Sequence, residues 1–215
     1  LKRYPQNRLI QHLARCALTF CCPAAKNLAL GRYEAPLPTA RTCNAHCFGC
    51  ISLQPESSGF PASQNRIGFT PTAGEIVEIM TLHARRAKNP VLSFGQGCEG
   101  EPLTEAKLIA EAIELFRNGG GRGTVNINTN ASRPGVLPTL AQAGLDSIRV
   151  SLNSARDACY NRYYRPQGYT FADVRESIAT AKQSGLFVSL NYLFFPGLND
   201  TEGELEALTE LISST

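Results

Sequence analysis

Residues 90–130, "PVLSFGQGCEGEPLTEAKLIAEAIELFRNGGGRGTVNINTN", are typical of a strand, a helix and a second strand. Residues 90–97 form a short apolar run closed by glycines, as in a buried strand. Residues 104–121 have helical periodicity, a predicted N-cap at Thr104 and a glycine stop. The expected apolar face of this helix consists of Leu108, Ala112 and Leu115. Residues 124–130 alternate like a strand, so the stretch predicts one strand–helix–strand unit.

The same alternation extends to both sides of this unit. Residues 73–87 predict a helix with Thr72 as N-cap and with a buried face of Ile76, Ile79, Met80 and His83. Further strands are expected at 37–42, 146–154 and 186–197, and further helices at 136–144, 170–185 and 201–214. Five strands and five helices in strict alternation predict a parallel sheet with helices outside it, either an open doubly wound sheet or a TIM-like barrel.

Composition limits the class of protein. The 215 residues are 43% hydrophobic and 18% charged, which is typical of a globular chain. The net charge of +3 comes without a long basic run, so no nucleic-acid surface is expected. No window of about 18 uninterrupted apolar residues occurs, which argues against a membrane span. The first residue is Leu1, and residues 1–38 are expected to be a helical N-terminal extension.

Polar residues gather where the predicted strands end. They are Cys43, Gly97 to Glu101, Asn128, Asn130, Ser151, Asn153 and Asn191. In parallel α/β folds the carboxyl ends of the strands form the edge at which ligands bind. The sequence therefore predicts one binding site at this edge.

Three of the eight cysteines lie in "RTCNAHCFGC", residues 41–50. Clustered cysteines in a chain with a large core are more often metal ligands or catalytic thiols than disulfides. Cys43, Cys47 and Cys50 are thus candidate ligands, and structural zinc completed by His46 or a distant cysteine is an alternative. The remaining cysteines outside the glycine-rich stretch are expected to be small buried hydrophobes: Cys16, Cys21, Cys22 and Cys159. Two histidines, His12 and His83, are expected in packing or surface roles.

Three motifs together resemble the radical S-adenosylmethionine (radical SAM) enzymes, from about Thr39 to the last residue. "CNAHCFGC" has the C-x3-C-x2-C spacing of the family, "GCEGEP" (97–102) is similar to its Gly-Gly-Glu-Pro segment, and "SIRVSLNS" to its Ser-Leu-Asp segment. The resemblance implies a partial TIM-like (β/α) barrel of parallel strands. Residues 39–215 would be a (β/α)6 core that lacks its last strand, so a fragment of a longer protein is expected.

The resemblance also implies the chemistry. Three cysteines leave one iron of a [4Fe-4S] cluster without a protein ligand, and S-adenosylmethionine would bind there. One electron would then yield a 5′-deoxyadenosyl radical that abstracts a hydrogen from an unidentified small-molecule or peptide substrate. An electron donor such as flavodoxin or ferredoxin and a cytoplasmic location are expected. The alternative is a non-catalytic zinc or iron–sulfur module.

The cofactor contacts follow from the same resemblance. The segment expected beside the methionine amino group comprises Gly97, Cys98, Glu99, Gly100, Glu101 and Pro102. Either Glu99 or Glu101 would meet the amino group, and the spacing to Pro102 favours Glu101. Ser151 and Asn153 match positions that contact the cofactor carboxylate or the ribose, and Asn128 and Asn130 are expected to reach the ribose or the substrate. Either Arg162 or Arg165 is expected to pair with the carboxylate. Asn128 and Asn130 have an alternative role in capping the sheet edge.

Two features bear on the site without completing it. The family commonly has an aromatic residue directly before the third cysteine, whereas this chain has Gly49 there and Phe48 one position earlier. The loop at 51–71 and the end of the last predicted strand are expected to shape the substrate pocket. The candidate substrate contacts are Phe60, Arg66, Tyr192 and Phe194.

Overall fold

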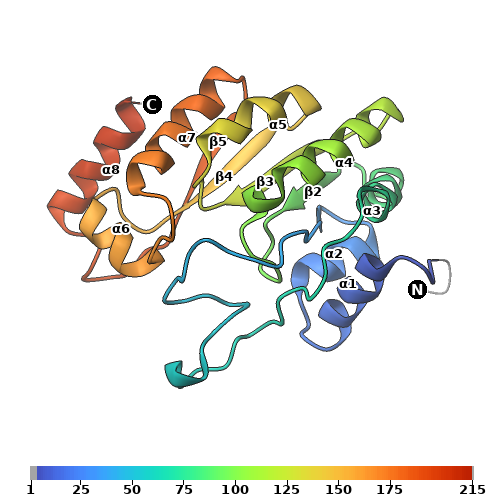
Figure 1. Ribbon diagram of the computed structural model, residues 1–215, viewed down its shortest axis with the longest axis horizontal. Coiled ribbons are helices and arrows are strands. Elements are labelled where there is room, and N and C mark those ends of the chain that lie inside the picture. The colour runs from blue at the N-terminus through green and yellow to red at the C-terminus, as the bar shows by residue number, and fades with distance from the viewer. Residues whose placement is uncertain (1–3, 215) are drawn as a thin grey trace.

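The protein is built on a five-stranded parallel sheet, seen here in a computed structural model that describes residues 4–214 (Figure 1). The strands are β1 (Glu34–Pro36), β2 (Val91–Phe94), β3 (Thr124–Thr129), β4 (Ser147–Leu152) and β5 (Phe187–Tyr192). Their order in the sheet is β1-β2-β3-β4-β5, and every neighbouring pair is parallel. A doubly wound sheet reverses its order at a switch point. The sequential order therefore identifies the other predicted fold, a partial TIM-like (β/α) barrel.

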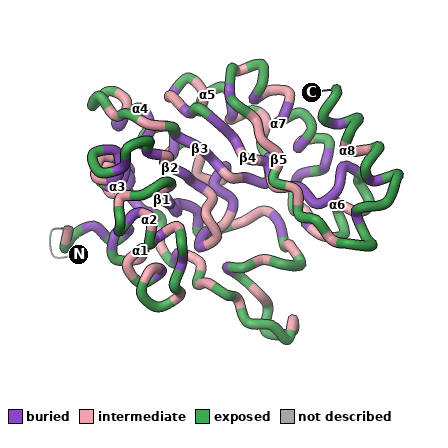
Figure 2. Tube along the Cα trace, turned by 180° about the vertical axis from the view of Figure 1, so that it is seen from behind, coloured by how far each residue is buried: buried purple, intermediate pink, exposed green. Residues whose placement is uncertain are grey.

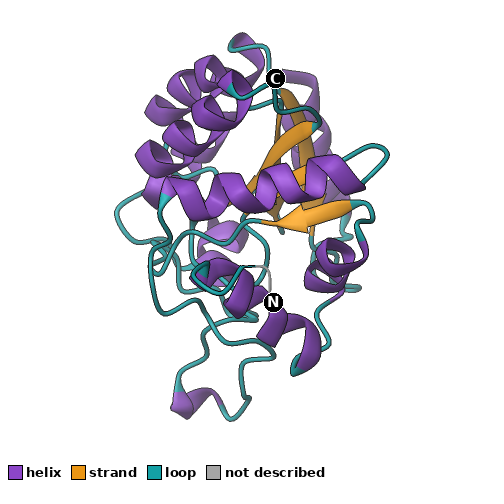
Figure 3. Ribbon diagram, turned by 90° about the vertical axis from the view of Figure 1, so that its right-hand side faces the viewer, coloured by secondary structure: helices purple, strands orange, loops and turns teal. Residues whose placement is uncertain are grey.

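The helices that link the strands lie side by side on the outer face of the sheet (Figures 1 and 3). They are α3 (Ala73–Arg86), α4 (Ala106–Asn118), α5 (Leu137–Ala143) and α7 (Phe171–Gln183), and α8 (Glu202–Ser214) follows β5. Two helices precede the sheet, α1 (Arg8–Leu18) and α2 (Pro23–Leu30), and a short helix, α6 (Asp157–Tyr164), lies between β4 and α7. Helix α1 contacts α2 and α3, and α2 contacts β1. No helix among residues 4–214 is long and apolar enough to cross a membrane.

The two faces of the sheet differ in chemistry. One face is apolar and belongs to the main hydrophobic core, which Figure 2 shows as buried strands at the centre of the molecule. Its members include Leu92, Phe94, Val125, Ile127, Ile148 and Val150. Because side chains alternate along a strand, the residues between them point to the opposite face. That inner face is polar, and it carries Glu34, Ser93, Asn126, Asn128 and Arg149.

Several helix signals are confirmed. Thr72 caps α3, since its hydroxyl accepts a hydrogen bond from the Glu75 N–H while the Glu75 carboxylate accepts one from the Thr72 N–H. The four residues expected on the inner face of α3 are all buried. His83 has the predicted packing role, because its Nε2 lies 3.0 Å from the Tyr33 carbonyl oxygen.

The expected first strand at residues 37–42 is wrong. β1 ends at Pro36, and residues 38–42 form no strand. Pro38 has no N–H to donate to a ladder. The backbone that follows it pairs instead with the glycine-rich segment, through a 2.7 Å hydrogen bond from the Gly100 N–H to the Ala40 carbonyl. The chain before the cysteines is therefore shaped by the site and not by the sheet.

Two expectations about α4 are also wrong. Thr104 is not its N-cap, because a 3-10 helix at Pro102–Glu105 precedes α4, and the Glu101 side chain caps that turn by accepting from the Leu103 N–H. Of the expected face, Ala112 is buried and Leu108 is half-buried, but Leu115 is 50% exposed. The buried face also contains Ile109, Ile113 and Phe116, so it extends to the residue after each expected position.

Helix α6 does not appear among the predicted elements. Its sequence, "DACYNRYY", is short and polar, and its buried contacts come from two aromatic residues, Tyr160 and Tyr164. Tyr160 stacks on Tyr164 with the ring centroids 4.6 Å apart. A single pair of apolar residues four positions apart is too short a pattern to predict a helix from sequence, so only the packed structure reveals α6.

Candidate cofactor site

The cysteine loop lies against the glycine-rich segment that follows β2. The Glu101 N–H donates to the Thr42 carbonyl at 2.9 Å, next to the Gly100–Ala40 bond. A Cβ atom on Gly100 would lie 1.9 Å from the Thr42 carbonyl oxygen. Only glycine allows the two backbones to approach this closely. The predicted neighbourhood of the "CNAHCFGC" and "GCEGEP" motifs is thus present in the fold.

A second segment holds the loop from the other side. Ala45 and Pro166 form an isolated antiparallel bridge, and the Phe48 N–H donates to the Tyr163 carbonyl at 3.0 Å. The Gln167 N–H donates to the Asn44 carbonyl at 2.8 Å. The cysteine loop is therefore clamped between the turn after β2 and the end of α6. Sequence reasoning missed this clamp together with α6.

The three loop thiols are half-buried and widely spaced. Among residues 4–214 the one group of three possible ligand atoms within 4.8 Å of one another is at His12, Cys16 and Cys98, so Cys43, Cys47 and Cys50 are spread more widely. Thiolates on a single zinc ion lie about 3.8 Å apart, given Zn–S bonds of about 2.3 Å. Cysteines on different irons of a cubane are farther apart, because the cluster itself separates them. The three loop thiols are therefore not gathered around the position of a single ion in this structure.

The environments of the loop thiols differ. Burial raises the pKa of Cys43, and burial raises the pKa of Cys47 to about 12, so both thiols hold their protons until a metal replaces them. At Cys50 burial is outweighed by hydrogen bonds from Ser52 and Leu53 and by the charge of Arg66, and the pKa is lowered. The Arg66 guanidinium lies 3.6 Å from the Cys50 sulfur. Arg66, predicted as a substrate contact, thus contacts the cysteine loop.

The Glu99 carboxylate is occupied by the protein itself. One oxygen accepts from the N–H groups of Thr39 at 2.7 Å and Ala40 at 2.8 Å, and the other accepts from the Gly95 N–H. Burial raises the pKa of Glu99 to about 7, while these N–H donors favour the charged form and act against the rise. Glu99 therefore fixes the chain before the cysteines to the turn after β2.

The Glu101 carboxylate is likewise buried and engaged. It accepts from the Leu103 N–H at 3.0 Å, the Thr129 hydroxyl and the Asn130 N–H at 2.8 Å. Burial raises its pKa to about 7, against the effect of these donors. The Asn130 side chain in turn donates to the Asn44 side chain at 2.9 Å. The turn after β2, the end of β3 and the cysteine loop thus form one connected unit.

Asn128 faces the inner side of the sheet and lies next to that unit. Its Oδ1 accepts from Arg149 at 3.0 Å, and its amide donates to the Phe94 carbonyl at 2.8 Å. Arg149 also pairs with Glu34 at 3.2 Å. Glu34 and Arg149 were not among the predicted site residues. The sequence signal that could have identified them is their position in β1 and β4, where polar residues alternate with the apolar core residues.

Unpaired polar groups lie at the ends of β4 and β5. The buried Asn153 Oδ1 has no hydrogen-bond partner within the described chain, and its amide donates to the Cys159 carbonyl at 3.4 Å. Ser151 is half-buried and pairs in register with the exposed Asn191. A buried carbonyl oxygen without a donor is costly, so it fits a position where a ligand supplies one.

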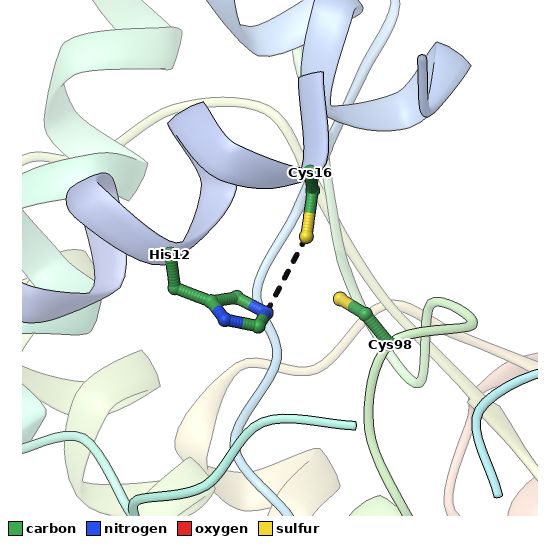
Figure 4. A group of neighbouring side chains, drawn as sticks. All are labelled: His12, Cys16 and Cys98. Atoms are coloured by element: carbon green, nitrogen blue, oxygen red, sulfur yellow. Dashed lines mark hydrogen bonds between the residues drawn. The ribbon is translucent and has the colours of Figure 1, made fainter. Parts of the chain in front are cut away.

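Other predicted residues are less closely tied to this edge. Arg162 and Arg165 are exposed, and the Arg165 guanidinium lies 5.4 Å from the centre of the Phe48 ring. Gly97 packs against Ile51, since a Cβ atom there would lie 2.5 Å from the Ile51 methyl carbon. Phe60 and Phe194 are exposed, whereas Tyr192 is half-buried. The side chain of Cys98 points toward α1 (Figure 4).

Known proteins are similar to this chain in sequence and in fold. Residues 37–210 match the Radical SAM superfamily. The human "Molybdenum cofactor biosynthesis protein 1" is 30% identical over 187 residues, which cover 85% of this chain and 27% of that protein. The "Dual-specificity RNA methyltransferase RlmN" of Azorhizobium caulinodans is 28% identical over 53% of this chain and 29% of its own length. The chain thus spans less than a third of these curated relatives.

A solved structure shows the same fold. The FeFe-hydrogenase maturase HydG from Carboxydothermus hydrogenoformans superposes with a TM-score of 0.61 at 15% identity, covering 99% of this chain and 54% of that one. The family match covers most of the chain, and its residues include the cysteine loop and the Glu-Pro turn. The chain therefore belongs to the radical SAM superfamily.

Proposed function

We propose that the chain is the catalytic core of an enzyme that reductively cleaves S-adenosylmethionine to start radical chemistry on a polar substrate. The observation that carries this is the connected unit of cysteine loop, Glu101 and Asn130, which presents three half-buried thiols in one loop. When bound, a [4Fe-4S] cluster completed by S-adenosylmethionine supplies the electron that yields a 5′-deoxyadenosyl radical. Cys43, Cys47 and Cys50 would hold the cluster.

The other residues of the edge have distinct proposed tasks. Glu99 and Glu101 position the turn and the cysteine loop, since their carboxylates already accept several N–H and O–H bonds each. This revises the expectation that one of them meets the amino group of the cofactor directly. The Asn153 Oδ1 has no partner within the described chain and can accept a bond from a hydroxyl-bearing ligand, and the half-buried Ser151 lies two residues before it, so we assign both residues to the cofactor.

The substrate class follows from the inner face of the sheet. Glu34, Arg149 and Asn128 present charge and amide groups there, and the Arg149 side chain is partly exposed. A substrate that lies against this face needs polar groups of its own, because only one nitrogen of the partly exposed Arg149 guanidinium bonds to Glu34 and Asn128, and an apolar molecule would bury the remaining N–H groups without a partner. A separate reductant, such as a flavodoxin or ferredoxin, is part of the proposal because the reaction consumes an electron.

Anaerobic reconstitution with iron and sulfide tests the proposal. We expect about four irons per chain, an electron paramagnetic resonance signal that changes when S-adenosylmethionine is added, and formation of 5′-deoxyadenosine under reduction. Cys47→Ala should abolish all three, because the cluster loses a ligand. Cys21→Ala is the matched control, since Cys21 is exposed and lies outside the loop.

Two results would contradict the proposal. One is tight zinc without iron at the loop cysteines, which would identify a structural module. The other is cleavage of S-adenosylmethionine that persists in Cys47→Ala.

A further inference from the structure

A second group of metal-ligand side chains lies on the other side of the glycine-rich turn. His12 and Cys16 come from α1, and Cys98 comes from the turn after β2 (Figure 4). Their ligand atoms all lie within 4.8 Å of one another. The family resemblance assigns nothing to α1, and the cysteine loop contributes no residue to this group.

The geometry of the pair on α1 matches that of two ligands on one ion. His12 and Cys16 are four residues apart and therefore share one face of the helix. The His12 Nε2 lies 3.5 Å from the Cys16 sulfur. Two ligands on a tetrahedral zinc, with Zn–S of about 2.3 Å and Zn–N of about 2.0 Å, lie about 3.6 Å apart. No rearrangement of the pair is needed.

The third ligand arrives from a distant part of the chain and is held in place. Cys98 is 3% exposed, and its carbonyl accepts from the Ile67 N–H at 2.8 Å. Its neighbour Glu99 is fixed by three backbone N–H groups. Cys16 is 1% exposed. Two buried thiols and a half-buried imidazole thus lie close together, although they come from separate elements. Both cysteines are free, so no disulfide joins these elements.

We propose that His12, Cys16 and Cys98 form a second metal site that takes a thiophilic divalent cation, zinc being the best match. Thiolate and imidazole donors in tetrahedral geometry suit zinc, and water completes the fourth position on the side where His12 is half-buried. Binding releases one proton from each thiol, so the dication meets two thiolates and the site becomes neutral. No change of oxidation state is involved.

The site would tie α1 to the turn that carries Glu99, Gly100 and Glu101. It is independent of the proposed radical chemistry, since its three ligands hold a metal whether or not the loop cysteines bind a cluster. Its expected effect is structural, because an ion that binds only the folded state stabilises that state, and the stabilisation rises with the logarithm of the free ion concentration above Kd.

The test uses the full chain with the loop cysteines removed, Cys43→Ala/Cys47→Ala/Cys50→Ala, so that zinc cannot bind there. We expect about one zinc per chain after dialysis, and an X-ray absorption spectrum that shows two sulfur ligands and one imidazole. Adding Cys16→Ser or His12→Ala should lower the retained zinc at least about tenfold. Removing a residue that only hydrogen-bonds to a metal ligand already costs about 10- to 100-fold in affinity. Cys21→Ser and Cys159→Ser are matched controls and should keep the zinc.

The zinc content of the iron-loaded wild-type chain provides a second test that needs no variant. One zinc beside the iron, with the same two-sulfur spectrum, supports the site even where a variant fails to fold. Absence of zinc from both samples overturns the proposal. Zinc that survives Cys16→Ser in folded protein also overturns it, and so does a Cys16–Cys98 disulfide in place of zinc, found by peptide mass spectrometry.

Discussion

Glu99 shows how one side chain can set the geometry of a site without touching its ligands. Its two oxygens bind the backbone on both sides of the site: the chain before the cysteines at Thr39 and Ala40, and the turn after β2 at Gly95. Buried N–H groups need acceptors, and this carboxylate supplies them for three at once. Its importance therefore comes from donor groups that the sequence does not reveal.

Glu99→Gln tests this role. The amide NH2 would face an N–H donor at one of the two positions, because both carboxylate oxygens accept. We expect a loss of about 1–3 kcal/mol in the free energy of unfolding, the usual cost of an unsatisfied buried group. Urea denaturation measures it, and Glu111→Gln on the exposed side of α4 serves as control. Equal stability of the two variants would show that the N–H groups find other partners.

At the scale of elements, α1 is attached to α3 by an ion pair. The Arg8 guanidinium lies 2.7 Å from the Glu75 carboxylate, which also takes part in the capping box of α3. The hydrogen bond from Arg8, opposed by some burial and aided by the Thr72 N–H, lowers the pKa of Glu75 to about 2. A carboxyl group whose pKa is lower in the folded state stabilises the protein above its unfolded pKa.

The pH dependence of stability should therefore carry the signature of Glu75. Its contribution is complete above pH 4.5, the unfolded value, and is lost as the pH falls toward about 2. Glu75→Gln should cost on the order of 1 kcal/mol near neutral pH, because the Arg8 side chain of the pair is 52% exposed and solvent screens the interaction. The difference from wild type, measured by urea unfolding, should shrink below pH 4.5. A difference that stays constant with pH would exclude the ion pair as its cause.

The sequence was informative about elements where periodicity and caps agree, as in α3 with Thr72. It failed where tertiary contacts overrule local pattern. Residues 37–42 resemble a strand but pair with the glycine-rich turn, and α6 depends on the Tyr160–Tyr164 stack. For the site, the cysteine spacing predicted the metal-binding loop and the family resemblance predicted the Glu-Pro turn, whereas the clamp from residues 163–167 and the Glu34–Arg149 pair needed the fold.

At the scale of the whole molecule, the sheet has one uncovered edge. β5 pairs with β4, and no strand in the described part of the chain pairs with its other side. Phe187, at the start of β5, is 70% exposed. An edge strand with exposed apolar side chains and free backbone groups is a template for pairing with another chain.

The 215-residue chain should therefore associate with itself through β5. We expect a concentration-dependent rise in mass by sedimentation velocity, which Phe187→Lys should reduce because charge disfavours edge pairing. Leu18→Lys, which replaces an equally exposed side chain at the end of α1, should leave association unchanged. A monomer at all concentrations would show that this edge is protected.

The clamp on the cysteine loop also affects when during synthesis the metal site can form. The cysteine loop is synthesised well before the segment that clamps it by backbone hydrogen bonds, which is residues 163–167. At translation rates of about 5–20 residues per second, roughly 5 to 20 seconds separate the two events. Throughout that interval the thiols are exposed to solvent and the loop is not yet clamped. We therefore expect metal loading to follow the synthesis of α6.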